Sequence, residues 1–253
     1  MMYEKRPVKR MVVKSGSGWM FDKTENGYVL NRDQLDATIE EIALISNERE
    51  IMWVSSGAIA TALWKLGLKE VPDDVHKKAQ LAGIGQHSLM HLYEDEFGRY
   101  GKVCAQCLLG RENVIEDVDE KDIKEDDPRL NVKINLEGYL KDGVIPILNE
   151  NDFVYIAEIE NYRTPRDRIF GDNDKLAALI AKYTDSDLVV MLSYPIEDLG
   201  RGGGEAKEEA RHILEEAGIP LVIINDRYEK VDGRYKPKIR EFLGCTRRTK
   251  KIL

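Results

Sequence analysis

The feature that most constrains the fold of this chain is an end-to-end alternation of strand-sized apolar segments with amphipathic ones. Apolar strands that alternate with helices build a parallel sheet with helices on both faces. The sequence therefore predicts an α/β fold, a three-layer α/β/α sandwich with a mostly parallel central sheet. Six strands are predicted: Val8–Lys14, Ile51–Ser55, Val103–Leu109, Val144–Leu148, Asp187–Ser193 and Pro220–Asn225.

Helices are predicted between these strands from apolar residues that recur at helical spacing. Gly218 is expected at the C′ position of the last helix. The second is expected to be interrupted near Gly83 and Gly85. We find no repeat or linker and expect residues 1–253 to form a single domain. The predicted helices are Asp33–Asn47, Asp74–Tyr100, Pro128–Lys141, Asp174–Tyr183 and Glu205–Ala217.

Composition excludes several classes of protein. With 253 residues, 42% of them hydrophobic, the chain can bury a full core. Its 38 Lys and Arg against 46 Asp and Glu give a net charge of −8, so nucleic acid is not the expected partner. No apolar stretch approaches the ~20 residues of a membrane helix. These features, and a count of three cysteines, favour a cytoplasmic protein without membrane or disulfide framework.

Cys104 and Cys107 form a CxxC pattern within the third predicted strand. A redox or zinc site would need a second cysteine pair or a histidine cluster, and neither is present. We interpret the two cysteines as part of a buried strand and assign no metal-ligating residue in the chain.

Two glycine-containing clusters follow predicted strands, where open α/β sheets bind ligands. Lys14 precedes Gly16 and Ser17, small residues whose backbone N–H groups can approach a phosphate. Ser56 and Gly57 open a helix whose first N–H groups can hold an anion. Taken singly, each is equally well an ordinary turn or an ordinary serine cap.

A third, polar cluster is split between two segments. Asn149, Glu150, Asn151 and Asp152 follow the fourth strand, and residues 171–174 (GDND) open a later helix. These side chains supply acceptors for an ammonium group, donors for a carboxylate and outer-shell partners for Mg²⁺. Between the two segments, Val154 and Ile156 suggest a hairpin that leads into a basic loop, a candidate substrate lid.

A fourth cluster, residues 200–204 (GRGGG), runs into a helix whose first turn carries Lys207. It is not a P-loop, because Ala206 and Glu208 stand where that pattern needs Gly and Ser or Thr. Two lysines at cleft-facing element ends, Lys14 and Lys207, are what a transferring phosphoryl group requires.

Taken together, six motifs in this order resemble the amino-acid kinase family: VVKSGSG, VSSGAIA, QLAGIGQ, PILNEND, GDND and GRGGGEAK. The combination of NEND with GDND is similar to the branch that phosphorylates the side-chain carboxylate of L-glutamate. That resemblance implies transfer from ATP with Mg²⁺ to give L-glutamyl 5-phosphate, the first step of proline biosynthesis. It also implies a homo-oligomer, a dimer or tetramer, and feedback inhibition by proline.

The resemblance further implies roles for individual residues. Lys14, Lys207 and Asp174 would be catalytic, with Asp174 orienting the two lysines. The glutamate would be held by Ser56, Gly57, Asn151, Asp152, Asp172 and Asn173. The nucleotide would be bound by Lys14, Gly16, Ser17, Ser193, Gly202, Gly203 and Lys207.

The chain also departs from the family pattern. Ser193 and Tyr194 replace a usual Thr-Asp pair, and only Pro195–Leu199 bridges to the glycine-rich loop, which shortens the nucleotide side. The basic loop carries Arg163, Arg166 and Arg168, and a C-terminal PUA domain is not expected. Two alternatives therefore stay open: the same fold with another acid substrate or phosphoryl donor, and a catalytically silent subunit that senses glutamate or proline.

Overall fold

The computed structural model of the protein describes residues 7–110, 113–114, 127–154, 173–194 and 205–245. Its centre is a six-stranded sheet in the order β5-β6-β4-β1-β7-β8, and every pairing in it is parallel. All six predicted strands are confirmed, with shifts of one or two residues at their ends. The strands are β1 Arg10–Ser15, β4 Glu50–Ser55, β5 Cys104–Leu109, β6 Ile145–Glu150, β7 Leu188–Leu192 and β8 Leu221–Ile224.

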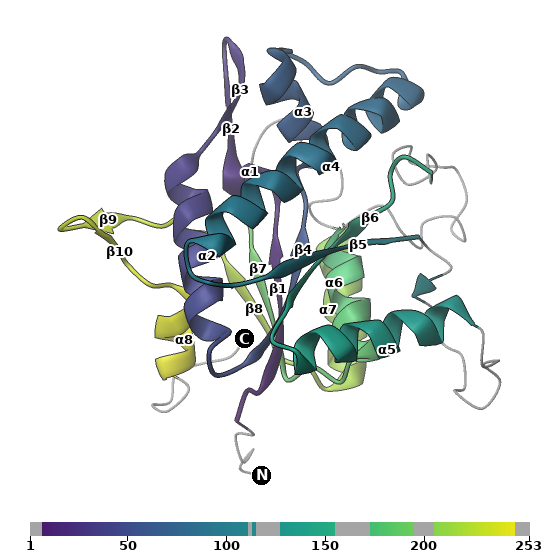
Figure 1. Ribbon diagram of the computed structural model, residues 1–253, viewed down its shortest axis with the longest axis vertical. Coiled ribbons are helices and arrows are strands. Elements are labelled where there is room, and N and C mark those ends of the chain that lie inside the picture. The colour runs from purple at the N-terminus through teal and green to yellow at the C-terminus, as the bar shows by residue number, and fades with distance from the viewer. Residues whose placement is uncertain (1–6, 111–112, 115–126, 155–172, 195–204, 246–253) are drawn as a thin grey trace.

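Helices cover both faces of this sheet, which confirms the predicted sandwich (Figure 1). Alternate residues of β1 illustrate the division: Met11 and Val13 pack with α2, α4 and α8, whereas Val12 packs with α5, α6 and α7. The helices are α2 Arg32–Ile45, α3 Ala58–Leu66, α4 Val75–Gly98, α5 Pro128–Lys141, α6 Asn173–Tyr183, α7 Glu205–Ala217 and α8 Ile239–Cys245.

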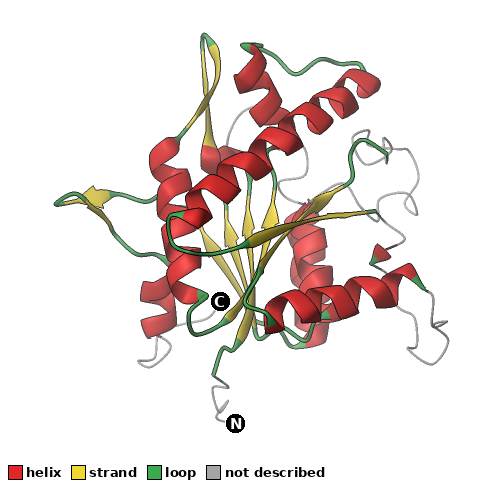
Figure 2. Cartoon of the chain, in the orientation of Figure 1, coloured by secondary structure: helices red, strands yellow, loops and turns green. Residues whose placement is uncertain are grey.

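Smaller elements are attached to this body. A four-residue helix, α1 Ser17–Met20, follows β1, and the antiparallel ribbon of β2 Phe21–Thr24 and β3 Gly27–Leu30 follows it. A second ribbon pairs β9 Lys230–Val231 with β10 Arg234–Tyr235. Both ribbons project from the body (Figure 2).

Local signals explain where the helices begin and end. The side chain of Asp74 accepts a hydrogen bond from Lys77 N at the start of α4. Asp127 caps α5 in the same way, with Pro128 in the first turn. Gly218 closes α7 with φ +68°, as predicted for a C′ residue.

The predicted interruption of the long helix is wrong. Helix α4 runs unbroken from Val75 to Gly98, and Gly85 serves helix packing within it. A Cβ on Gly85 would lie 1.7 Å from the carbonyl oxygen of Ala58 in α3. Gly85 therefore allows the backbones of α3 and α4 to touch, and Figure 1 shows these helices side by side.

The strand predicted around Cys104 and Cys107 is confirmed, but the prediction that both residues are buried is wrong. Cys104 and Cys107 are free thiols on the edge strand β5 and are only half-buried. Burial nevertheless raises the pKa of each thiol to about 11, so both stay protonated at neutral pH. Within the described residues no group of three or more His, Cys, Asp or Glu is placed to hold a metal ion.

Candidate active site

Lys14 lies at the carboxyl end of the central strand β1 and is 7% exposed. In the sheet it is paired with Val54 on one side and Met191 on the other. Its Nζ forms an ion pair with Oδ1 of Asp174, a buried residue in the first turn of α6. A buried charge must be paired, and the helix N-terminus also favours a carboxylate. The structure therefore brings together two of the three residues predicted to be catalytic.

The turn after β1 leaves space beside the Lys14 ammonium. Gly16 N donates to Leu192 O at 3.1 Å, which ties the turn to β7. A Cβ on Gly16 would lie 3.8 Å from Lys14 Nζ, so a longer side chain there would extend around the ammonium. Ser17 follows as the first residue of α1.

The turn after β4 requires a glycine. Gly57 has φ +109°, in the region that L side chains rarely adopt, and a Cβ would also lie 3.4 Å from the Phe21 ring. Ser56 N donates to Ser15 O at 3.0 Å, which holds this turn against the end of β1. The structure thus brings the turn of Ser56 and Gly57 next to the end of the strand that carries Lys14.

Side-chain amides from three elements meet next to this turn. Asn173 Nδ2 donates to Ser56 Oγ at 2.9 Å and to Asn149 Oδ1 at 3.1 Å. Asn149 Nδ2 donates in turn to Oε1 of Gln86, a buried residue of α4, at 2.8 Å. Sequence reasoning noted the QLAGIGQ motif but did not assign Gln86 to the site.

Asn151 and Asp152 follow β6 at the same end of the sheet. Asn151 N donates to Leu109 O at 2.9 Å, which fixes the start of this turn on β5. Burial raises the pKa of the Asp152 carboxyl to about 6. A carboxylate that is costly to ionise when alone is ready to pair with a cationic group of a ligand.

Lys207 lies on the other side of β1, near the end of β7. Its Nζ donates to Ser193 Oγ at 2.8 Å, and Ser193 N is held by Ile224 O at 2.9 Å. Lys207 itself belongs to helix α7, but its ammonium group is bound at the end of β7, the strand next to β1, which carries Lys14. Asp172, Gly202 and Gly203 lie outside the described residues, as do the arginine-rich loop and most of the predicted hairpin.

Arg227 is a contact residue that sequence reasoning missed. Its guanidinium lies 4.1 Å from the ring centroid of Tyr194, and it donates to Gly18 O at 2.6 Å and to Asp22 Oδ1 at 2.5 Å. The residue thereby joins the end of β7 to the turn after β1. No local pattern could have predicted this, because more than 200 positions separate Arg227 from Gly18.

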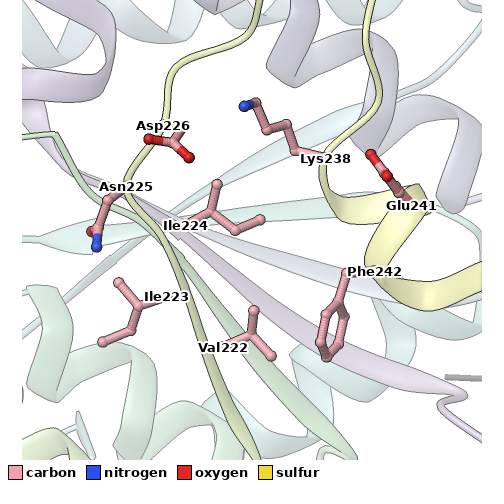
Figure 3. Close-up of a pocket in the computed structure, with 8 residues that line it drawn as sticks. All are labelled: Val222, Ile223, Ile224, Asn225, Asp226, Lys238, Glu241 and Phe242. Carbon is pink, nitrogen blue, oxygen red and sulfur yellow. The ribbon is translucent and has the colours of Figure 1, made fainter. Parts of the chain in front are cut away.

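A cavity of about 470 Å³ lies between β8 and α8 (Figure 3). It is lined by apolar side chains of β8 and by Asn225, Asp226, Lys238, Glu241 and Phe242. None of the predicted site residues lines it, so it is separate from the group around Lys14.

Among the described residues, no helix is both long and apolar enough to cross a membrane.

A parallel sheet with polar turns at the carboxyl ends of its strands is typical of α/β proteins that bind ligands at that edge of the sheet. The sequence profile described as the amino acid kinase family matches residues 9–194. The chain belongs to the amino acid kinase family.

Individual relatives narrow this class. The chain is 40% identical over 260 residues to the glutamate 5-kinase of Caldanaerobacter subterraneus subsp. tengcongensis, covering 89% of this chain and 64% of that one. It is 38% identical over 188 residues to glutamate 5-kinase of Myxococcus xanthus, covering 74% and 44%. For glutamate 5-kinase of Clostridium tetani the identity is 31%, and the coverage is 89% and 90%. The chain thus spans only about half to two thirds of the first two relatives.

Solved structures support the fold alone. Carbamate kinase from Giardia lamblia bound to AMP-PNP superimposes with a TM-score of 0.53 at 15% identity, covering 86% of this chain and 92% of that one. Isopentenyl phosphate kinase superimposes equally well at 13% identity, covering 85% and 91%. At these identities the likeness says nothing about substrates.

Proposed function

We propose that this protein is an ATP-dependent kinase of the side-chain carboxylate of L-glutamate, forming L-glutamyl 5-phosphate. The observation that carries this proposal is the buried Lys14–Asp174 pair, set between the amide group of Asn149 and Asn173 on one side and Lys207 on the other. In this proposal the phosphoryl acceptor binds on the β4 side of β1, and the phosphoryl donor binds on the β7 side. The likeness to glutamate 5-kinases supports the choice of acceptor.

On the acceptor side, the polar groups suit an amino acid. In this proposal Asp152 receives the ammonium group, and the amides and hydroxyl around Asn173 orient the substrate. The turn at Gly57 offers backbone N–H donors that no side chain obstructs. The full set on this side is Ser56, Gly57, Asn151, Asp152, Asp172 and Asn173.

On the donor side, Lys207 and the residues around it suit a polyphosphate. Its ammonium is held by Ser193 at the strand end next to Lys14, so two positive charges can face one phosphoryl group. ATP supplies that phosphoryl group and Mg²⁺ its charge neutralisation. Magnesium in such sites is bound largely by phosphates and water, which fits the lack of a three-acid cluster among the described residues. The set on this side is Lys14, Gly16, Ser17, Ser193, Gly202, Gly203 and Lys207.

The residues of the chain act by alignment and by charge. A carboxylate is already nucleophilic at neutral pH, so no general base is required. Lys14 stabilises negative charge between the acceptor and the transferred group, and Asp174 holds the Lys14 ammonium in position. The remaining parts of the proposal are a cytoplasmic location, assembly into a homo-oligomer and inhibition by proline.

The proposed reaction predicts glutamate-dependent release of ADP. Purified protein with Mg-ATP is expected to release ADP only when L-glutamate is present, and hydroxylamine is expected to trap the acyl phosphate as a hydroxamate. ADP release is measured by a coupled assay and the hydroxamate by its iron complex. D-glutamate and L-aspartate serve as control acceptors. Equal turnover without any acceptor would contradict the proposal.

The raised pKa of Asp152 predicts an acid limit to the activity. Because the ionised carboxylate is the form that pairs with an ammonium group, kcat/KM for L-glutamate is expected to fall about tenfold per unit below pH 6. The profile is measured from pH 7.5 to 5. Asp152→Asn is expected to flatten this limb and to lower kcat/KM at pH 7.5. An unchanged acid limb in that variant would assign the limb to another group.

The raised pKa of the Asp152 carboxyl also predicts that stability and activity depend on pH in opposite directions. Its pKa in the folded protein lies above the unfolded value near 3.8, so the folded state favours the protonated form. Stability is therefore lost as the pH rises from about 4 to about 6. Asp152→Asn is expected to raise Tm at pH 7.5 and to leave it nearly unchanged at pH 4. A Tm gain that is equal at both pH values would contradict this origin.

A further inference from the structure

Gln86, Asn149 and Asn173 form a chain of amides whose polarity is set by one backbone group. Glu150 N donates to Asn149 Oδ1 at 2.9 Å, and a backbone N–H can only donate. The Asn149 oxygen therefore faces this N–H, and its Nδ2 must face Gln86. Gln86 must in turn accept through Oε1, so its Nε2 donor is turned away from Asn149.

The orientation of the Asn173 amide, at the other end of this chain of amides, follows in the same way. Asn173 donates through Nδ2 to the already oriented Asn149 oxygen, so its acceptor Oδ1 is turned away. Gln86 Nε2 and Asn173 Oδ1 are both buried, and neither has a hydrogen-bond partner in the part of the chain that the structure describes. Unpaired buried amide atoms are costly, so each calls for a partner. The network thus presents one unused donor and one unused acceptor.

The position of the donor identifies which group of a substrate it meets. Leu148 is paired with Val54, and Val54 with Lys14, so Asn149 lies two strands away from β1. Neighbouring strands are ~4.8 Å apart, so strand β6, which carries Asn149, lies roughly 10 Å from strand β1, which carries Lys14. A carboxylate bound at Gln86, beyond Asn149, is therefore not the carboxylate that reacts beside Lys14.

We propose that Gln86 is a recognition residue for the amino-acid substrate: its Nε2 donates to the α-carboxylate, the one that is not phosphorylated. This inference rests on the proposed function and adds a residue and a contact to it. Because Gln86 is 7% exposed on the rigid helix α4, its amide is held in place before the substrate arrives. The site thereby selects α-amino acids over simple amines with a terminal carboxylate.

The test compares L-glutamate with 4-aminobutyrate, which keeps the reacting carboxylate and the amine but lacks the α-carboxylate. Affinity is measured without nucleotide from the ligand-dependent rise in Tm, and kcat/KM from hydroxamate formation. Gln86→Met removes the donor. Gln86→Glu also removes it, yet retains an oxygen that can accept from Asn149 Nδ2. In both variants the preference for L-glutamate over 4-aminobutyrate is expected to fall at least 10-fold.

Gln80→Glu is the matched control, because Gln80 is exposed on the same helix. It is expected to keep the wild-type preference. A purely structural role for Gln86 would weaken both ligands by the same factor and overturn the inference. If the wild-type protein gains no Tm from L-glutamate and forms no hydroxamate, the proposed function fails as well. If the wild type binds L-glutamate and the variants keep its preference, only the role of Gln86 is overturned.

Discussion

Gly85→Ala is expected to destabilise the protein by at least about 3 kcal/mol, at the upper end of the range for overpacking. The added Cβ would lie 1.7 Å from Ala58 O, 2.6 Å from Ala58 C and 2.9 Å from Ala62 N. All three are backbone atoms, so no rotamer change can relieve the clash, and α3 must move away from α4. At ~2–4 °C per kcal/mol for a chain of this size, Tm should fall by about 10 °C.

Thermal and urea unfolding measure this effect, and Gly83→Ala is its matched control. Gly83 lies in the same helix, but a Cβ there would only contact the Phe153 side chain, at 3.4 Å. Alanine is the better helix former by up to ~1 kcal/mol, so this control should be neutral or slightly stabilising. Equal stabilities for the two variants would show that the contact between α3 and α4 is looser than the structure indicates.

Gly85→Ala is also expected to lower the affinity of the protein for L-glutamate. The start of α3 carries the turn at Ser56 and Gly57, and α4 carries Gln86 one residue beyond Gly85. Separating the two helices therefore moves both sides of the proposed acceptor site. Gly85 thus connects the packing of the fold with the geometry of the site.

Lys14→Ala is expected to lower kcat for glutamate-dependent ADP release by at least about 1,000-fold. In the proposed reaction Lys14 supplies positive charge where the transferred group becomes more negative, and preorganised electrostatic groups of this kind contribute factors of ~10²–10³. Steady-state kinetics at saturating glutamate and ATP measure the effect. Lys141→Ala, at an exposed lysine, is the control and should keep full activity.

The double variant Lys14→Ala with Asp174→Asn separates the catalytic effect of the Lys14 charge from its effect on stability. Lys14→Ala also removes the ammonium that faces the buried Asp174 carboxylate, so it should lower stability by a few kcal/mol. Adding Asp174→Asn should restore much of that stability without restoring turnover. If the double variant recovers activity along with Tm, Lys14 is structural and the assignment of its catalytic role is wrong.

Much of this architecture was predictable because its signals are local. Strand β1 contains a run of buried apolar residues, Met11 to Val13, followed by Lys14 and Ser15, and such runs predict a central parallel strand. Turn chemistry after β4 and the polar residues at the start of α6 likewise follow from neighbouring positions. Because parallel strands end at one edge of the sheet, Lys14, Ser56 and Asn151 could be proposed for one site before their contacts were known.

The sequence by itself thus determined the layers, the strands and the side of the sheet where polar residues gather. Only the tertiary structure decided that α4 is continuous, that Gln86 joins the amide chain and that Arg227 holds Tyr194 against the turn after β1. Helical spacing and turn signals reach only a few residues along a chain. Close approach of two helices, and hydrogen bonds between residues 63 or 209 positions apart, depend instead on how the elements pack.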